Sequence, residues 1–470
     1  MSTIASSGRG RPSRLGALRS GAADLPLLVV GALLLSTSSD ILPNDTIVGV
    51  GEVQFNLARI LVVVALFALV ATNGLRFELV RTGVAVPLLL LLAVGLYTSH
   101  KFGTYPRYRF LVEGVAVFYL TCAVVRARAD GRDGLALVAM VALAIAGLTA
   151  VAQVAQGVQT GFYRHGCTPV TLPPSATPPG GSLTRATGTF SNPNVLGGYL
   201  LLLLPLGALA SAYVARMRGA WAALALACGL GALSLVFTFS RAAVLMALVA
   251  IAVGVLLSGS RYRRYLIVVV LAAAAAIVFL AGSCGSDATA GYGRTEEWRQ
   301  TLEVIKDNPL WGVGLGRLGA VLHARNELST ARHAHNLFLT WWAEAGTGAL
   351  VAWVWLSVVL LWRSLRGALR GSAAARTGLV ALLGFFGFSM LDHPANTDRV
   401  ALAFWIVAGF AAATGEPGRG WIARFRGRGG RRGEPDDDSE LPESEEHSPS
   451  LVERPRTGNV RPMPREPGGL

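Results

Sequence analysis

Apolar runs of about the length that crosses a lipid bilayer recur along most of this sequence. A helix needs roughly 20 apolar residues to span the hydrocarbon core, because each residue advances it by about 1.5 Å. The predicted spans begin at Leu25 and continue at residues 54–72, 84–99, 109–125, 134–156, 195–215, 219–239, 241–258, 264–282, 336–362, 377–391 and 399–414. The pattern therefore predicts an all-α polytopic membrane protein with about 12 transmembrane helices.

The composition agrees with a membrane protein. Hydrophobic residues make up 52% of the chain and charged residues 15%, whereas a soluble protein carries about a quarter charged residues. A soluble helical protein would also need shorter, amphipathic apolar stretches. The net charge of +14 does not indicate nucleic acid as a partner, because the arginines lie in short loops between apolar runs, where they act as topology signals.

The arginines also predict which side of the membrane each loop faces. If the N-terminus is cytoplasmic, every inner connection is basic, as the positive-inside rule demands. The inner arginines are Arg76, Arg81, Arg126, Arg128, Arg132, Arg216, Arg218, Arg261, Arg263, Arg264, Arg363, Arg366, Arg370, Arg376 and those between Arg419 and Arg432. This orientation puts two long loops on the outer side, at about residues 157–194 and 282–335, and the second of them has a helical pattern.

We expect three parts along the chain. Residues 1–23 form a basic cytoplasmic N-terminus, residues 24–415 form the transmembrane domain, and residues 416–470 form a cytoplasmic tail. The tail is predicted to be disordered, because beyond Arg432 it is acidic and rich in Pro and Ser. No small-residue cleavage pattern follows the first apolar run, which is therefore expected to be an uncleaved helix and not a signal peptide.

The four cysteines divide by predicted location. Cys122 and Cys228 fall within spans, where they are expected to pack as small apolar side chains. Cys167 and Cys284 fall one in each long outer loop, in a compartment where disulfides persist. We predict a disulfide between Cys167 and Cys284, with two free thiols on one face as the alternative.

The stretch Gly293–Gly348 interrupts the apolar pattern on the predicted outer side with Arg, Glu, Asp, Asn and His. Its first part repeats apolar residues three or four apart, as in a helix. We expect this helix to end near Asn308, because the residue before Pro309 is pushed out of the helical region. A polar cap above a membrane-embedded bundle is a natural place for chemistry.

Two histidines close this polar stretch, where His333, His335 and Asn336 stand at the start of the next apolar run. Imidazole titrates near neutrality, and the apolar setting should favour its neutral form, so His335 is a candidate general base. A metal site is the alternative interpretation of H-A-H-N. No Cys or carboxylate set with metal-ligand spacing accompanies the histidines, so we predict neither a metal nor another cofactor.

Three arginines lie on the outer side, against the topology rule. Arg241 stands in a very short hairpin at the membrane surface, Arg185 precedes a turn that should cap the next helix, and Arg294 opens the outer helix. The alternatives are a snorkelling anchor, a solvated loop residue and a surface ion pair respectively. Because guanidinium binds phosphate oxygens in a planar fork, the group predicts a phosphate-bearing substrate such as a lipid-linked diphosphate.

Five motifs follow one another on this outer side. They are RATGTFSNPN at Arg185–Asn194, TFSRAAV at Thr238–Val244, R-x-x-x-W at Arg294–Trp298, NPLWGVGLG at Asn308–Gly316 and HNLFLTWWAEAGTG at His335–Gly348. In this order they resemble the O-antigen ligase-like family of bacterial membrane glycosyltransferases, which includes O-antigen ligases and polysaccharide polymerases. The resemblance covers roughly residues 180–360 by motif and nearly the whole chain by topology.

The resemblance implies a GT-C-like helical architecture in the bacterial cytoplasmic (inner) membrane. It implies a glycan donor on undecaprenyl diphosphate and an acceptor hydroxyl on a glycan, lipid or protein at the extracytoplasmic face, without a metal. Carried over by motif, His335 would be the base, and Arg241 and Arg294 would hold the diphosphate, with Arg185 as a weaker addition. His333 and Asn336 are interpreted as support for His335.

A transporter or flippase of lipid-linked sugars is the alternative function. Such proteins place ionisable groups near the bilayer midplane and show internal repeats. Here the notable groups gather at one face, and the sequence shows no convincing repeat. An O-antigen ligase and a polysaccharide polymerase differ in their acceptor, and the sequence does not separate them.

Overall fold

The computed structural model describes part of the chain in detail. The described residues are 14–38, 48–50, 53–55, 60–64, 66–67, 83–127, 129–157, 185–214, 220–259, 261, 263–265, 267–268, 270, 272, 288–325 and 333–415. All of them belong to one unit, residues 1–417. The predicted cytoplasmic tail beyond Gly415 and the predicted Cys167–Cys284 disulfide lie outside the described residues, so both stay predictions.

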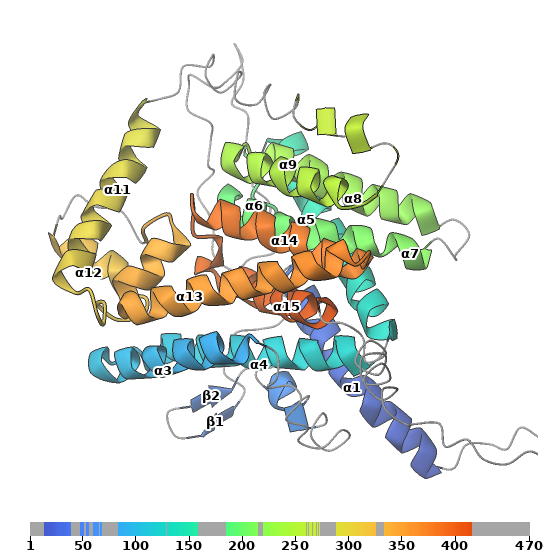
Figure 1. Cartoon of the computed structure of the whole chain (residues 1–470), viewed down its shortest axis with the longest axis horizontal. Helices are drawn as coiled ribbons and strands as arrows, with labels where there is room; N and C mark the ends of the chain where they lie inside the picture. The colour runs from blue at the N-terminus through green and yellow to red at the C-terminus, as the bar shows by residue number, and fades with distance from the viewer. Residues whose placement is uncertain are drawn as a thin grey trace, which may run out of the picture. The chain divides into compact units, whose positions relative to one another are not determined.

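Helices dominate the described part and follow the apolar runs (Figure 1). They are α1 (Arg14–Ser36), α3 (Ala85–Phe102), α4 (Tyr105–Ala127), α5 (Ala129–Gln156), α6 (Pro193–Leu209), α7 (Ser211–Val214), α8 (Ala220–Phe237), α9 (Arg241–Leu256), α11 (Ala288–Asp307), α12 (Leu318–Arg325), α13 (Leu337–Leu369), α14 (Ala373–Ser389) and α15 (Asp398–Thr414). Among the described residues, α3, α4, α5, α8 and α13 are long and apolar enough to cross a membrane. Shorter apolar helices occur in α1, α6, α9 and α14. The chain is thus a helical membrane protein, and the count of 12 spans stays a prediction.

Two short strands are the exception, and the second overlaps the start of a predicted span. Strand β1 (Val48–Val50) pairs antiparallel with β2 (Val53–Phe55), with Val48 opposite Phe55. The predicted span 54–72 therefore begins too early. Its first two residues, Gln54 and Phe55, belong to β2, where Val53 and Phe55 are residue types that favour a strand.

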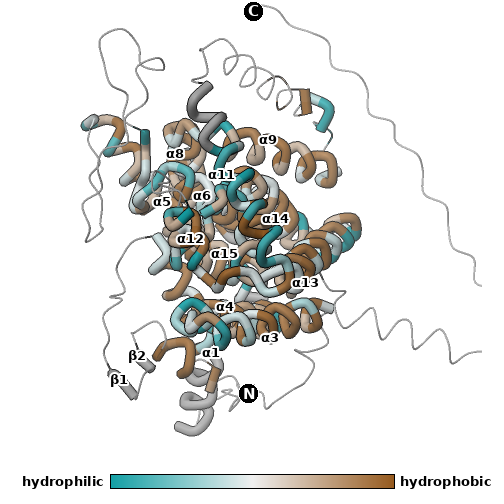
Figure 2. Tube along the Cα trace, turned by 90° about the vertical axis from the view of Figure 1, so that its left-hand side faces the viewer, coloured by the Kyte–Doolittle hydropathy of each residue, from teal (hydrophilic) through white to brown (hydrophobic). Residues whose placement is uncertain are grey.

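The apolar helices pack around α14, which contacts α6, α9, α13 and α15, while α15 also lies along α4. Aromatic rings fill the centre. Trp353 of α13 stacks on Trp341 at 5.3 Å, and Phe385 of α14 stacks on Phe404 of α15 at 5.1 Å. Figure 2 shows these helices as predominantly hydrophobic. In this core Cys122 is buried, and its thiol donates to the Gly409 carbonyl at 3.2 Å.

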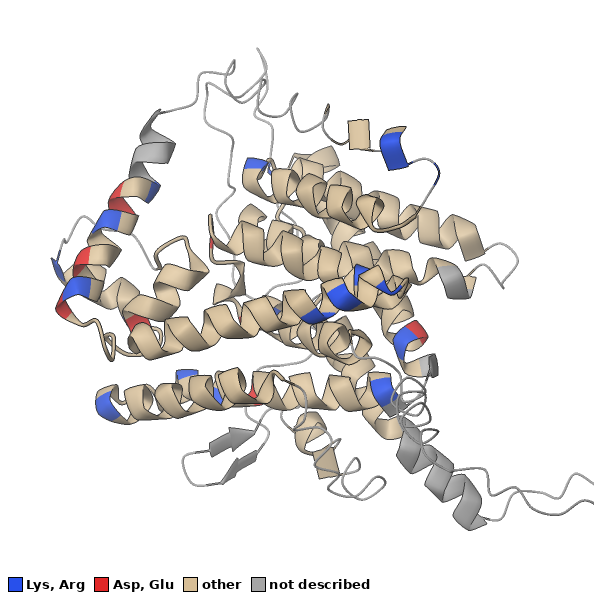
Figure 3. Ribbon diagram, viewed as in Figure 1, with Lys and Arg blue, Asp and Glu red and all other residues tan. Residues whose placement is uncertain are grey.

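The charged helix α11 and the short α12 differ from the rest. They lie beside the start of α13 (Figure 1), and α11 carries alternating acidic and basic residues (Figure 3). Their apolar side chains pack against Ala343 of α13 in a small second core, formed by Val304, Ile305, Val313, Leu318 and Leu322. As predicted, α11 ends at Asp307, just before Asn308-Pro309.

Helix α13 is broken near its start, and the loop Asn308–Gly316 fills the break. Gly346 has φ 79° and ψ −176°, a conformation that an L side chain rarely adopts. A Cβ at Gly346 would also collide with the carbonyl oxygen of Leu310. Two hydrogen bonds of 2.9 Å run from loop N–H groups to α13 carbonyls, Val313 to Ala343 and Gly314 to Glu344. The loop thereby replaces part of the interrupted helical ladder.

Side chains tie the same loop to α13. The Glu344 carboxylate accepts a hydrogen bond of 2.7 Å from the Gly316 N–H. Thr347 donates its hydroxyl to the Pro309 carbonyl at 2.7 Å and accepts the indole N–H of Trp342 at 3.0 Å. These bonds fix the α11–α12 connection onto α13, and so they fix where α11 stands relative to the residues that precede α13.

Candidate active site

Asn336 builds the entrance to α13. Its side chain accepts hydrogen bonds from the N–H groups of Phe338 and Leu339, at 2.9 and 3.1 Å, as a helix N-cap does. Its amide also donates to the Met390 carbonyl at 2.9 Å. Asn336 therefore joins the start of α13 to the end of α14, and its sequence-based role as support for His335 fits this position.

His335, directly before this cap, has φ 44°. A histidine in the left-handed region stores roughly 1–3 kcal/mol of strain, which the surrounding contacts must offset. Its backbone N–H donates to Nδ1 of His333 at 3.2 Å, and the two rings meet edge to face at 4.3 Å. His333 thus holds the backbone conformation of His335.

The imidazole of His335 is paired with Asp392. Nδ1 of His335 lies 3.1 Å from Oδ1 of Asp392, whose side chain is 6% exposed. Asp392 lies between α14 and the short 3₁₀ helix η3 (Pro394–Asn396) that precedes α15. Asp392 was not predicted from the sequence. One sequence signal could have found it: Asp392 is a carboxylate next to His393, in the short outer connection between the last two predicted spans.

Helix α11 contributes two further charges, Arg294 and Glu297. Nη2 of Arg294 lies 3.7 Å from Oδ2 of Asp392, and Oε2 of Glu297 lies 3.7 Å from Nε2 of His335. Residues three apart on a helix share a face, so α11 turns both side chains toward the His335–Asp392 pair. The approach of Glu297 to His335 was not predicted from the sequence.

The pKa of His335 shifts in the direction opposite to the sequence-based prediction. Burial lowers the pKa of His335, but the hydrogen bond and charge of Asp392, together with Glu297, outweigh burial and raise the pKa above its ordinary value. The expectation that the neutral form is favoured was therefore wrong, because the two carboxylates are invisible in the local sequence. Burial raises the pKa of Asp392, but hydrogen bonds from His335 and the His393 backbone outweigh it and lower the pKa.

A third histidine adjoins the pair. The ring of His393 meets that of His333 edge to face at 5.3 Å. Burial, reinforced by the charge of His333, lowers the pKa of His393 to about 3, so its imidazole is neutral at physiological pH. His393 also donates its backbone N–H to Asp392 at 2.7 Å.

The structure brings Arg185 near the cluster. Its Nε donates to the Thr238 carbonyl at 2.9 Å, and its Nη2 lies 3.4 Å from Oδ1 of Asn194. Burial lowers the pKa of Arg185, the charge of Arg294 lowers it further, and Asp392 opposes both. Arg185 is therefore close enough to Arg294 and Asp392 for their charges to be felt, and it also clamps the turn before α9.

Arg241 is the first residue of α9 and is exposed. Within the described part of the chain it makes no hydrogen bond or ion pair. The turn that carries it is well fixed, since Arg185 binds Thr238 and the Ala186 N–H donates to the Phe237 carbonyl at 2.9 Å. The structure thus brings Arg185, Arg294 and His335 together. Among the described residues, Arg241 is linked to them only through the turn before α9, which Arg185 binds.

Arg399, another residue that the sequence analysis missed, secures the turn before α6. Its guanidinium stacks over the Phe190 ring at 4.5 Å and donates to the Thr189 carbonyl at 2.6 Å. Asn192 caps α6 as predicted, accepting a hydrogen bond of 2.8 Å from the Asn194 N–H.

Donor atoms of His333, His335 and Asp392 lie within 4.8 Å of one another and could together hold a metal ion. The sequence suggested no such set, because Asp392 is far along the chain from the histidines. Hydrogen bonds within the set already use Nδ1 of both histidines and Oδ1 of Asp392. The prediction that the protein uses no metal therefore stays a prediction.

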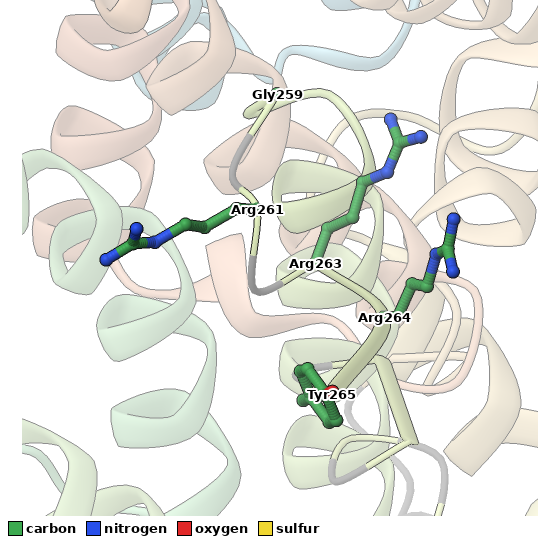
Figure 4. Close-up of a pocket in the computed structure, with 5 residues that line it drawn as sticks. All are labelled: Gly259, Arg261, Arg263, Arg264 and Tyr265. Carbon is green, nitrogen blue, oxygen red and sulfur yellow. The ribbon is translucent and has the colours of Figure 1, made fainter.

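A cavity of about 420 Å³ lies elsewhere, after the C-terminal end of α9. Gly259, Arg261, Arg263, Arg264 and Tyr265 line it, and Arg261 points away from the other two arginines (Figure 4). Arg241 begins α9 and the cavity follows its end, so the cavity is separate from the His335 cluster. Its arginines are those of a predicted inner loop, where the topology rule accounts for them.

A search of curated proteins found no match to this chain. The family described as O-antigen ligase matches residues 200–354, a stretch that contains Arg241, Arg294, Glu297 and His335, while Arg185 and Asp392 lie outside it. This match, over about a third of the chain, supports an O-antigen ligase-like family, and the apolar helices indicate a membrane protein.

Proposed function

We propose that this protein is a membrane glycosyltransferase that moves a glycan from an undecaprenyl-diphosphate carrier to an acceptor hydroxyl on the extracytoplasmic face. The observation that carries the proposal is the pair formed by His335 and the nearly buried Asp392. An ionised carboxylate at Nδ1 selects the tautomer with a proton on that nitrogen. Nε2 is then left with the lone pair that a general base needs.

In the proposed reaction, the acceptor oxygen attacks the anomeric carbon while its proton passes to Nε2 of His335. The bond between that carbon and the diphosphate oxygen breaks, and its electron pair leaves with the diphosphate. The imidazolium that forms is stabilised by Asp392 and Glu297, which already raise the pKa of His335. A single displacement of this kind inverts the anomeric centre.

The arginines would bind the departing diphosphate, whose charge grows in the transition state. Arg294 is 41% exposed, and its contact with Asp392 is 3.7 Å long, so most of its N–H donors can turn toward a ligand. Arg241 would contribute from the start of α9, and Arg185 from the clamped turn beside it. In this proposal the lipid chain of the donor stays in the bacterial inner membrane, and its diphosphate reaches the site at the membrane surface.

A strain that lacks this protein provides the test. We expect its membranes to accumulate lipid-linked glycan on the extracytoplasmic side and to lose the glycan-bearing product, with both restored by the full chain. Accessibility of the accumulated glycan to periodate added outside spheroplasts reports its side. Accumulation on the cytoplasmic side only would overturn the proposal in favour of a transporter or flippase.

Substituting Arg241 by Lys is expected to lower transfer by at least about tenfold, although the charge is kept, since one ammonium cannot reproduce a two-pronged contact with phosphate. The matched variant Arg185→Lys should lose less than about tenfold, the effect of one or two ordinary hydrogen bonds. Transfer rates in membranes with equal protein abundance are the measurement. Near wild-type turnover in Arg241→Lys would make Arg241 a membrane anchor only.

Transfer should persist in EDTA without added metal, since the proposed base and phosphate ligands are side chains of the protein. The measurement is the transfer rate in membranes that have been treated with chelator and washed. Loss of activity that Mg²⁺, Mn²⁺ or Zn²⁺ restores would contradict this prediction and assign His333, His335 and Asp392 to a metal.

A further inference from the structure

One buried acceptor atom beside His335 has no hydrogen-bond donor within the described part of the chain. This atom is Oε2 of Glu297. Its separation of 3.7 Å from Nε2 of His335 exceeds the length of a hydrogen bond. The neighbouring Glu296 behaves differently, because it is exposed and bound by Arg299 at 2.8 Å.

A buried carboxylate oxygen without a donor is destabilising, and native structures seldom keep one without a reason. Here α11 keeps Glu297 in this position, because the Asn308–Gly316 loop holds α11 against α13. Burial also raises the pKa of Glu297, against the opposing charges of His335 and Arg294. A hydrogen-bond donor from a bound ligand would therefore satisfy the Glu297 carboxylate and remove this cost.

We propose that Glu297 binds a second hydroxyl of the acceptor, next to the hydroxyl that His335 deprotonates, so that the acceptor is a sugar with a vicinal diol. This inference rests on the proposed function. The oxygens of neighbouring hydroxyls on a sugar ring are close enough together for one to reach Nε2 of His335 and the other to reach Oε2 of Glu297. A protein or lipid acceptor with a single hydroxyl would leave Glu297 unsatisfied.

The roles of the two groups differ in the reaction. The proton of the attacking hydroxyl passes to Nε2 of His335 as the new bond to the anomeric carbon forms and the bond to diphosphate breaks. The neighbouring hydroxyl keeps its proton and donates a hydrogen bond to Glu297 throughout. Glu297 is therefore a specificity residue for the acceptor, and it adds to the charge that stabilises the imidazolium.

The test compares Glu297→Gln with Glu296→Gln, a matched change one residue away on the exposed side of α11. The purified full chain is supplied with lipid-linked glycan extracted from the deletion strain as donor. A detergent extract of membranes from a strain that makes no donor supplies the acceptor. We expect Glu297→Gln to lower transfer roughly 10–100-fold, the effect of losing a hydrogen bond to a charged group, and to raise the half-saturating amount of acceptor extract.

Glu297→Asp, which keeps the carboxylate, should recover part of the loss, and Glu296→Gln should stay within about twofold of wild type. Because the charge of Glu297 raises the pKa of His335, the acidic limb of the pH–rate profile should move to lower pH in Glu297→Gln. Binding of undecaprenyl diphosphate should be unchanged in Glu297→Gln, which shows that the variant is folded and the donor side intact.

Periodate tests the class of acceptor directly, because it cleaves vicinal diols. Pretreating the acceptor extract with periodate, then quenching, should abolish transfer by the wild-type protein. Transfer that survives this treatment, or a Glu297→Gln variant that behaves like Glu296→Gln, overturns the inference. Absence of transfer by the wild type, or full transfer by His335→Ala, would instead contradict the proposed function itself.

Discussion

Replacing His335 by Ala should lower glycan transfer by about 10²–10⁴-fold, the usual consequence of removing a positioned general base. The protein should remain inserted at normal abundance, since the neighbouring cap depends on Asn336 and not on the imidazole. The measurement is the transfer rate in membranes of the complemented deletion strain, normalised to protein detected by antibody.

The control for this change is His333→Ala. It removes the acceptor of the His335 backbone N–H but leaves the bond between His335 and Asp392, so a smaller loss is expected. An inactive His333 variant beside an active His335 variant would show that the base is assigned to the wrong imidazole.

Replacing Asp392 by Asn should lower transfer almost as much as removing His335. The Asn amide can donate a hydrogen bond to Nδ1 and so favour the tautomer whose proton lies on Nε2. In that tautomer Nε2 cannot accept the proton of the acceptor hydroxyl. Arg294 also loses its carboxylate partner. Asp398→Asn, a change at an exposed carboxylate in the first turn of α15, provides the control and should leave the rate nearly unchanged.

The pH dependence gives Asp392→Asn a second readout. A general base acts when it is deprotonated, so wild-type transfer should rise with pH through the raised pKa of His335. Without the Asp392 charge this pKa falls, and the acidic limb of the pH–rate profile should move to lower pH even though the maximum rate drops. An unchanged limb would mean that Asp392 does not act through His335.

Local signals in the sequence determined much of the membrane architecture. Hydropathy is a property of consecutive residues, so it located most helices, and a proline two residues beyond Asp307 predicted where α11 ends. Asn192 caps its helix through the residues that follow it, and such contacts are recognisable in the sequence. The strands at Val48–Phe55 were not predicted, because a short valine-rich stretch fits a strand as well as it fits the start of an apolar helix.

The family motifs located His335, Arg294 and Arg185, but the partners of His335 depended on the tertiary structure. Asp392 lies 57 residues beyond His335, and only the packing of α14 against α13 brings the two together. Glu296 and Glu297 are alike in sequence. Which of them faces His335 depends on how α11 is rotated, and that rotation is fixed by the loop filling the break in α13.

The pKa of His335 shows most clearly the difference between what the local sequence predicts and what the tertiary structure decides. The sequence around it is apolar, and burial alone does lower its pKa. The actual direction is upward, because charge acts through space and two carboxylates from α11 and the α14–α15 connection converge on the ring. Sequence by itself determined that this chain is a helical membrane protein, and it predicted a histidine and arginines on one side of the membrane. The tertiary structure decided which charges surround that histidine, because proton affinity depends on distances in space and not on separation along the chain.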